Sequence, residues 1–316
     1  MDKRPLVIIT GPTGVGKTDI SIDLAKKING EIISADSIQI YKYMDVGSAK
    51  IMPEEMDGVP HHLVDELYPD QEFNVFVFKE IAKKAIEGIY ERNRIPVIVG
   101  GTGFYIQSIL YDIDFSDEDN EQGTIRKKYM DLAAEHGNDY LHDMLRRVDP
   151  ESAELIHKNN VKRVIRALEF FEINGKKISE HNEEQKQNES PYNFEYFVLN
   201  RERSGLYDRI EKRVDIMLED GLENEVRELL DKGYDRKLVS MQGLGYKEMA
   251  AYIEGEISLD EAVYLIKRDT RRFAKRQLTW FRREKIVRLL NYEDFDNSKS
   301  KMCEFMIECL KKRGII

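Results

Sequence analysis

The sequence of 316 residues predicts an α/β protein in which helices flank a parallel sheet and a helical insertion domain interrupts it. Short apolar runs, typical of strands buried on both faces, alternate with helical patterns over the first hundred residues. After about residue 111 an acidic stretch is expected to form a loop, and the pattern from there to about Gly175 is helical. An apolar run near residue 196 then returns to the strand pattern. We therefore expect a core formed by residues 1–111 and 194–316, with residues 112–193 inserted as a helical domain.

The strands of this core are expected to be short and to precede loops or helices. Ile20, Leu24 and Ile28 recur every four residues, so the helix after the first strand should carry them on one face. Gly30 is expected to end that helix, because glycine readily adopts the left-handed conformation found there. The polar segment 175–192 should form a mobile loop that leads back to the sheet. The predicted strands are residues 6–10, 31–36, 95–99 and 194–199.

A phosphate-binding loop follows the first strand. The segment GPTGVGKT matches G-x-x-x-x-G-K-[ST] at every fixed position. Its glycines let backbone N–H groups curl around phosphate oxygens, and the following helix N-terminus adds a positive dipole end. Lys17 can neutralise phosphate charge, and Thr18 can bind Mg²⁺. The predicted diphosphate- or nucleotide-binding residues are Gly11, Pro12, Thr13, Gly14, Val15, Gly16, Lys17 and Thr18.

Two further segments should lie beside this loop. Asp36 ends the second predicted strand, and ligands of open α/β sheets bind at the carboxyl ends of strands. An ordinary turn-forming aspartate is nearly as good an interpretation. Gly100 to Gly103 permit close backbone approach to a ligand and Thr102 offers a hydroxyl, but a simple strand-to-helix turn explains them equally well. The strand before Gly100 lacks the terminal acid that binds Mg²⁺ in typical ATPases.

The charge of the chain is unevenly distributed. A net charge of −10 disfavours nucleic-acid binding, yet residues 271–288 contain eight basic side chains and one acid, Glu284. Such a patch can bind phosphates on a protein that is acidic elsewhere. No apolar run approaches the roughly 20 residues that span a membrane, and no signal peptide is evident, so we expect a cytoplasmic protein. Cys303 and Cys309 are expected to be reduced and structural.

An ordered series of motifs runs along nearly the whole chain. The motifs are GPTGVGKT (11–18), ISADS with QIY (33–41), MDVGSAK (44–50), GGTGFY (100–105), R with RALE (163–169), GLGYKE (243–248) and TR with AKRQLTWFR (270–282). This series resembles that of the bacterial tRNA dimethylallyltransferases, also called tRNA isopentenyltransferases. Eukaryotic relatives carry a C-terminal zinc finger that this chain lacks.

The resemblance implies a reaction. Dimethylallyl diphosphate donates its five-carbon group to the exocyclic N6 amine of the adenine just 3′ of the tRNA anticodon. Diphosphate leaves, so the loop would hold the departing group without ATP hydrolysis. Asp36 would be the general base, and Thr102 and Arg213 would lie at the diphosphate or the reaction channel. The adenine must leave its stack to reach such a site.

The same resemblance, with the charge pattern, implies contacts to the tRNA anticodon stem-loop. Lys162, Arg163 and Arg166 lie away from an apolar helix stripe of Val161, Val164, Ile165, Leu168 and Phe171, although a solvated face explains them as well. Arg272, Lys275, Arg276, Thr279 and Arg283 can share a helix face near aromatic residues, which suits single-stranded RNA. The expected RNA-binding residues are Asp36, Ser37, Ile38, Gln39, Thr102, Arg126, Lys162, Arg163, Arg166, Gly243, Gly245, Tyr246, Lys247, Lys275, Arg276 and Gln277.

Other functions use the same loop. A small-molecule kinase would transfer phosphoryl from ATP, but would need neither the insert nor the basic stretch. A prenyltransferase acting on free adenine nucleotides would not need an RNA-sized basic surface. A nucleotide switch is disfavoured, since no N-K-x-D element is present. Whether ATP binds is left open, and a monomer is the default expectation.

Overall fold

The computed structural model describes residues 3–113, 122–185, 188–284 and 286–316. It divides into two compact units, Met1–Leu110 with Pro191–Ile316, and Tyr111–Ser190. The boundaries expected from the sequence, after residues 111 and 193, fall close to these divisions. Several residues of the expected acidic loop and of the basic stretch lie outside the described residues: Asp114, Asp117, Glu118, Asp119, Glu121 and Lys285.

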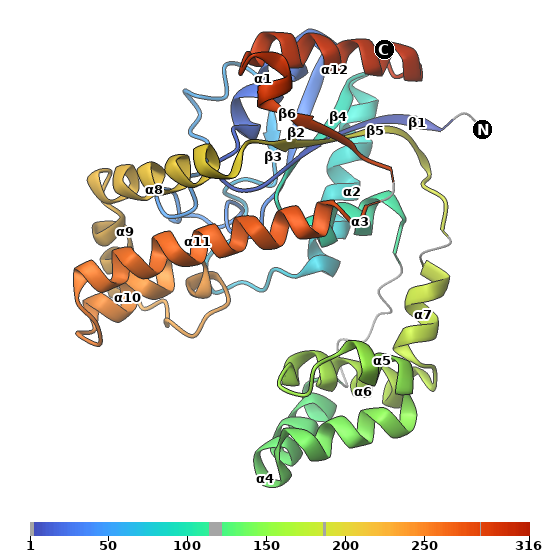
Figure 1. The fold of residues 1–316 in the computed structure, drawn as a ribbon, viewed down its shortest axis with the longest axis vertical. Coiled ribbons are helices and arrows are strands. Elements are labelled where there is room, and N and C mark those ends of the chain that lie inside the picture. The colour runs from blue at the N-terminus through green and yellow to red at the C-terminus, as the bar shows by residue number, and fades with distance from the viewer. Residues whose placement is uncertain (1–2, 114–121, 186–187, 285) are drawn as a thin grey trace. The chain divides into compact units, whose positions relative to one another are not determined.

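In its described part, the first unit contains a six-stranded sheet in the order β3-β2-β4-β1-β5-β6, with every pairing parallel (Figure 1). The four expected strands are confirmed, and the short edge strands β3 and β6 were not expected. Strand β5 pairs with β1, so the chain returns to the sheet after the insert as predicted. The strands are β1 (Arg4–Thr10), β2 (Gly30–Ala35), β3 (His61–His62), β4 (Ile95–Gly100), β5 (Tyr192–Asn200) and β6 (Arg288–Asn291).

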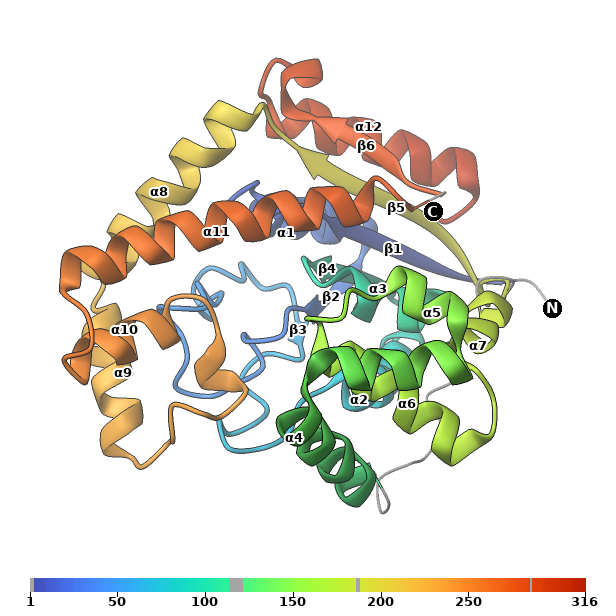
Figure 2. The same ribbon diagram turned by 60° about the horizontal axis from the view of Figure 1, so that its bottom comes forward.

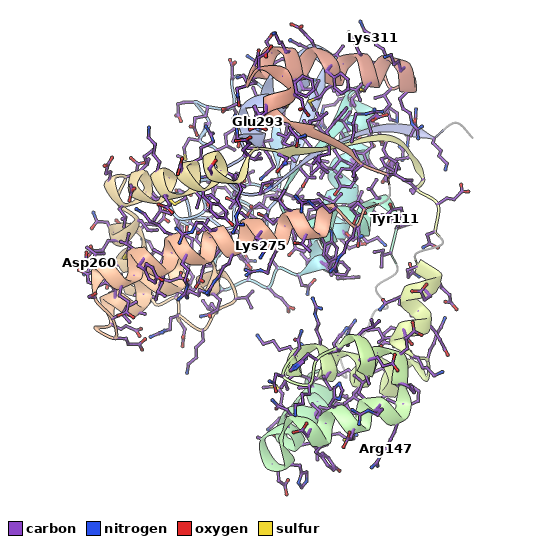
Figure 3. The ribbon with its side chains drawn as sticks, viewed as in Figure 1. Tyr111, Arg147, Asp260, Lys275, Glu293 and Lys311 are labelled. Carbon is purple, nitrogen blue, oxygen red and sulfur yellow. The ribbon has the colours of Figure 1, made fainter. Side chains whose placement is uncertain are left out.

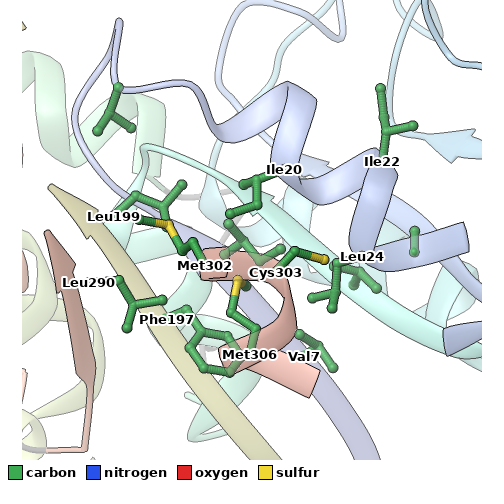
Figure 4. Packing of buried hydrophobic residues seen from close by; sticks show 14 of the residues in the cluster. Val7, Ile20, Ile22, Leu24, Phe197, Leu199, Leu290, Met302, Cys303 and Met306 are labelled. Atoms are coloured by element: carbon green, nitrogen blue, oxygen red, sulfur yellow. The ribbon is translucent and has the colours of Figure 1, made fainter. Parts of the chain in front are cut away.

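One face of the sheet packs against α1 (Lys17–Ile28) and α12 (Lys299–Arg313). Alternate strand residues, including Val7 and Phe197, join Leu24, Met302 and Met306 in one apolar cluster (Figure 4). All of them are buried, as are the predicted helix-face residues of α1. Burying this apolar area is the main driving force for holding both helices on the sheet.

The intervening residues of the same strands point to the other face. Leu6 and Ile8 are fully buried there, outside the first cluster. Helix α2 (Val75–Glu91) contacts β2 and β4, and α3 (Gly103–Leu110) packs on α2. The sheet is therefore covered on both faces, as continuous apolar strands require.

The end of α1 differs from the prediction. The helix ends at Ile28, and Asn29 adopts the left-handed conformation at φ 54° and caps it. Gly30 instead begins β2, where a Cβ atom would lie 3.0 Å from both Ile95 O and Val97 Cγ2. Asparagine tolerates left-handed geometry and can cap the helix, so Gly30 is not needed there and instead allows β2 to pack closely on β4.

The C-terminal part of the first unit is mainly helical (Figure 2). Helix α11 contacts α8, α10 and α3. Cys303 and Cys309 are free and buried in α12. Among the described helices, none is both long and apolar enough to cross a membrane. The remaining elements are α8 (Arg203–Glu219), α9 (Leu222–Asp231), η1 (Ser240–Gln242), α10 (Tyr246–Ile253), α11 (Leu259–Phe281) and η2 (Tyr292–Phe295).

The second unit is helical, as expected. Val164, Ile165 and Leu168 are buried in a cluster with residues of α4, but Phe170 is buried in α6 while Phe171 is only partly buried. The helices are α4 (Gln122–Val148), α5 (Pro150–Leu155), α6 (Val161–Asn174) and α7 (Ile178–Gln185).

Helix α7 corrects the prediction of a mobile loop over residues 175–192. The fully buried carboxylate of Asp149 accepts hydrogen bonds from the backbone and hydroxyl of Ser152 and of Ser179, at 2.7 to 3.1 Å. Ser179 lies in the first turn of α7. Because hydrogen bonds to one buried acid dock this helix, its sequence carries little of the apolar periodicity by which helices are recognised.

Candidate active site

The phosphate loop connects β1 to α1 at the carboxyl edge of the sheet. Gly11, Gly14 and Gly16 have φ values of 149°, 78° and 100°, which residues with a Cβ rarely adopt. A Cβ on Gly11 would lie 2.5 Å from Leu199 O, so β5 also excludes a side chain there. Gly16 is the N-cap of α1, which places the loop at a helix N-terminus where backbone N–H groups favour anions.

Lys17 lies within this loop and is strongly influenced by its surroundings. Its ammonium donates to the carbonyl oxygens of Gly11 and Pro12, both at 3.0 Å. Desolvation lowers the pKa of Lys17 to about 8; the negative charge of Asp36 opposes this shift, and the positive charge of Arg213 adds to it. The three side chains therefore share one electrostatic environment. A bound polyphosphate would stabilise the charged form of Lys17.

Asp36 follows β2 at the same edge and is partly buried. Its Oδ1 atom accepts hydrogen bonds from the backbone N–H groups of Ile38, at 2.9 Å, and Gln39, at 3.3 Å. The turn-forming interpretation is therefore correct as geometry. Because both bonds use Oδ1, the turn leaves Oδ2 outside it. The same carboxylate also supplies charge near Lys17 and Arg213, so turn formation and a role in the site coexist.

The glycine-rich turn after β4 lies against β2. Thr102 donates its backbone N–H to Ala35 O at 3.3 Å, and a Cβ on Gly100 would lie 2.2 Å from the same oxygen. A Cβ on Gly103 would lie 2.1 Å from Trp280 Nε1. Backbone approach this close requires glycine, which a simple strand-to-helix turn would not. Thr102 is thus held beside the residue that precedes Asp36.

Gln277 of α11 joins the two glycine-rich loops. Its Oε1 atom accepts the backbone N–H of Thr13 at 2.9 Å, and its Nε2 atom donates to Gly101 O at 3.0 Å. Only 6% of the residue is exposed. The sequence placed Gln277 among the RNA contacts; its buried position favours a role in holding the loops together.

Arginines of α8 and of the segment before it contact the phosphate loop region. Arg213 donates to Ala49 O at 3.4 Å, and Arg209, one turn earlier, donates to Gly14 O at 2.9 Å. Arg201 donates to Val15 O at 3.4 Å. Burial lowers the pKa of Arg213, but arginine starts so far above neutrality that it stays charged. Sequence reasoning missed Arg209, although its spacing of four from Arg213 signals a shared helix face.

The expected RNA-binding segments around residues 36–39 and 243–247 lie together. Ser37 is exposed, while a Cβ on Gly243 would lie 3.2 Å from Ile38 Cδ1. Tyr246, however, is fully buried and donates its hydroxyl to Glu225 at 2.8 Å. A buried ring cannot touch RNA, so the expectation for Tyr246 does not fit this structure. Lys247 is 40% exposed, and its ammonium lies 3.4 Å from Glu248; Gly245 is buried.

Helix α11 carries exposed cations near its C-terminal end. Lys275 (Figure 3) and Arg276 are exposed, and the Arg276 guanidinium lies 5.7 Å from the Phe273 ring centroid. Part of the basic stretch is neutralised, because Arg271 pairs with Glu211. The prediction that Arg283 lies on the same helix face is wrong, because the helix ends at Phe281.

In the second unit, the expected RNA contacts occupy two kinds of position. Lys162 and Arg163 are exposed in the first turn of α6, on the side away from its buried stripe, and Arg166 is partly buried. Arg126 makes two hydrogen bonds, at 2.9 and 3.0 Å, to the fully buried carboxylate of Glu169. Arg126 therefore also neutralises a buried charge inside the insert.

A parallel sheet with this strand order, flanked by helices and with a glycine-rich loop that leads into α1, is a P-loop NTPase-like fold. Two family models match the chain, IPP transferase over residues 39–284 and isopentenyl transferase over residues 4–68. A protein of Lachnoclostridium phytofermentans named tRNA dimethylallyltransferase is 59% identical over 313 residues, which cover 99% of each chain.

Solved structures give the same result. The full-length tRNA isopentenylpyrophosphate transferase from Bacillus halodurans has a TM-score of 0.73 at 42% identity, covering 99% of this chain and 98% of that one. A eukaryotic dimethylallyltransferase acting on tRNA has a TM-score of 0.76 at 30% identity, covering 91% of this chain and 74% of that one. The chain belongs to the IPP transferase family and is a prenyltransferase.

Proposed function

We propose that this enzyme transfers a dimethylallyl group from dimethylallyl diphosphate to N6 of the adenine 3′ of the anticodon in tRNA. The observation that carries the proposal is the convergence of Lys17, Asp36 and Arg213 at the carboxyl edge of the sheet. A phosphate loop with two cations suits a diphosphate leaving group, and a carboxylate beside it suits an amine that must lose a proton. Relatives that match the chain over nearly its full length carry the corresponding name.

The residues divide the chemistry between them. The N6 nitrogen forms a bond to C1 of the dimethylallyl group while the bond from C1 to the diphosphate oxygen breaks. Asp36 accepts the proton that leaves N6, a step that general bases typically accelerate by about 10²–10⁴-fold. The loop N–H groups, Lys17 and Arg213 stabilise the negative charge that develops on the departing diphosphate. Thr102, whose backbone N–H bonds to Ala35 O, would orient the diphosphate or the amine.

Mg²⁺ fits the donor set as an ion held mainly by the substrate. Thr18 is exposed at the first turn of α1 and offers a hydroxyl. Among the described residues, no group of three histidine, cysteine or acidic side chains could hold a metal. Mg²⁺ commonly takes most of its ligands from phosphates and water, so one hydroxyl suffices. The ion would supply positive charge to the diphosphate.

The tRNA partner would be held through its phosphates and its anticodon loop. Extruding the target adenine costs a few kcal/mol, which contacts elsewhere on the stem-loop must offset. Lys275 and Arg276 on α11, and Lys162 and Arg163 on α6, are among the exposed cations that would make such contacts. We propose that a monomer acts on one tRNA in the cytoplasm.

A transfer assay tests the proposal. The protein is incubated with Mg²⁺, labelled dimethylallyl diphosphate and either an unmodified tRNA or AMP, and in parallel with γ-labelled ATP. Label should appear on the tRNA, at the adenine 3′ of the anticodon, and not on AMP. Preferential labelling of AMP would identify a free-nucleotide prenyltransferase. Transfer of γ-phosphate to a small molecule without any prenyl transfer would identify a kinase.

A further inference from the structure

The loop of residues 44–50 contains a sequence motif that has no role in the chemistry above. Three consecutive backbone N–H groups of this loop bind one carboxylate that is distant in the sequence. The backbone N–H groups of Asp45, Val46 and Gly47 donate to Glu225 at 2.8, 2.7 and 3.0 Å. Successive N–H groups that converge in this way form an anion-binding concavity. Here an internal side chain from α9 fills it, so the loop is fixed by the protein itself.

Glu225 also connects this loop to α10. Tyr246, the first residue of α10, donates its hydroxyl to Glu225 Oε1 at 2.8 Å. A Cβ on Gly47 would lie 2.6 Å from the Tyr246 ring and 2.9 Å from Leu222, so the loop backbone packs directly on both helices. Since Glu225 receives four hydrogen bonds, losing its charge would disturb every one of these contacts.

The other end of the same loop reaches the active site. Ala49 O accepts hydrogen bonds from Arg213, at 3.4 Å, and from Gln39 Nε2, at 3.2 Å. Ala49 has a φ of 45°, a conformation that a residue with a Cβ adopts only when its surroundings impose it. The direction of this carbonyl therefore depends on the hold that Glu225 has on the loop. Lys50 provides a separate anchor, because its buried ammonium pairs with Asp45 and Asp65.

We propose that Glu225 is a positioning residue for prenyl transfer. It touches no substrate, and acts through the loop of residues 44–50 to orient Arg213 at the leaving diphosphate and Gln39 beside Asp36. This role rests on the proposed function. Lys50 keeps the loop attached when Glu225 is altered, so the loop should shift rather than unfold.

The test compares Glu225→Gln and Glu225→Asp with Glu223→Gln. Glu223 lies on the same helix and pairs with Arg227, one helical turn away. Glu225→Gln presents an amide to N–H donors, and a misplacement of about 1 Å caused by a mutation away from the chemistry can cost about 10²-fold in rate. We expect about that loss in single-turnover prenyl transfer to tRNA, with the affinity for dimethylallyl diphosphate unchanged. Glu225→Asp should react faster than Glu225→Gln but more slowly than the wild type, and Glu223→Gln should react at the wild-type rate.

Amide hydrogen exchange separates this role from the proposed function. The amides of residues 45, 46 and 47 should exchange faster in Glu225→Gln and at the wild-type rate in Glu223→Gln. Faster exchange with an unchanged transfer rate would overturn the positioning role, as would equal losses of rate in Glu225→Gln and Glu223→Gln. A wild-type protein that exchanges as expected but prenylates no tRNA would overturn the proposed function and this role with it. Should Glu225→Gln fail to fold, Glu225→Asp carries the same comparison.

Discussion

Lys17 combines a position proposed to bind phosphate with a pKa that desolvation lowers to about 8. The charge proposed to bind diphosphate is therefore partly lost in mildly alkaline solution. Asp36 shares the same environment but is held by its own turn. At the scale of single residues, the site thus pairs a cation that titrates in an accessible pH range with a carboxylate whose orientation the backbone sets.

The first prediction concerns Lys17 and pH. Bound diphosphate favours the ammonium and raises its pKa, so binding takes up a proton once pH exceeds about 8. Above this pH, affinity for dimethylallyl diphosphate should fall by up to about tenfold per pH unit. Titration calorimetry over roughly pH 7 to 10 measures this affinity. Lys17→Arg stays charged throughout and is the control. An equal fall in affinity in both proteins would contradict the assignment of Lys17 as the titrating group that binds diphosphate.

The second prediction concerns Asp36. Asp36→Asn keeps the shape and can still accept the hydrogen bonds of its turn, but it cannot take a proton from N6. Single-turnover prenyl transfer should fall by about 10²–10⁴-fold. Affinities for tRNA and for the donor should change far less, and both are measured beside the rate. An unchanged rate would leave Asp36 as a turn residue; a collapse of tRNA affinity would make it a binding contact.

At the scale of elements, α11 has a buried face and an exposed face with different contacts. On the buried face, Gln277 forms hydrogen bonds with the phosphate loop and with the turn after β4. The exposed face carries Lys275 and Arg276. The 3.6-residue repeat correctly predicted that Arg272, Lys275, Arg276 and Thr279 share a face, and all four are exposed. Gln277, which was expected among the RNA contacts, is buried. Periodicity does not show what the buried polar residue bonds to.

Gln277→Ala provides the third prediction. It leaves Thr13 N–H and Gly101 O without their side-chain partner, and each buried polar group left unsatisfied costs about 1–3 kcal/mol. The free energy of unfolding should fall by about that amount for each of the two groups, and donor affinity should fall as well. Urea unfolding and donor titration measure the two effects. Lys275→Ala, exposed two residues away, should alter neither. Normal donor affinity with lost tRNA binding would restore Gln277 as an RNA contact.

Arg276→Ala provides the fourth prediction. Affinity for single-stranded nucleic acid falls with salt at a log–log slope of about −0.7 per phosphate contact. Removing one such contact should therefore flatten the slope for tRNA by about that amount. Lys311→Ala, on α12 (Figure 3), removes an equally exposed cation and should leave the slope unchanged. Equal slopes in all three proteins would place the RNA elsewhere.

At the scale of the whole molecule, two separately packed units are proposed to share one tRNA. The fifth prediction is that Arg163→Ala, in the insert, flattens the salt slope as Arg276→Ala does in the core. The double variant should lose both contacts, since the effects of independent sites add. Filter binding over a salt series measures this. If Arg163→Ala matches the wild type, the insert's exposed cations form a solvated face, the alternative that their spacing left open.

The sequence predicted the larger part of this fold. Four of the described strands, the helix face of Ile20, Leu24 and Ile28, and the insert were all expected, because each depends on residues close together in the chain. The errors also have physical reasons. Strand β3 is only two residues long, and α7 docks through Asp149 rather than through an apolar stripe. The cap of α1 is Asn29 and not the predicted Gly30, because both residue types tolerate left-handed geometry and the sequence does not distinguish them.

The sequence by itself determined the phosphate loop, the acid at the end of β2 and the exposed cations of α11 and α6, since each is legible from neighbouring residues. Only the tertiary structure decided which distant side chains support them. Gln277 lies 264 residues from Thr13, Arg209 lies 195 from Gly14, and Glu225 lies 178 from Gly47. A backbone group has no side-chain identity to mark its partner, so a hydrogen bond between such a group and a remote side chain leaves no local pattern.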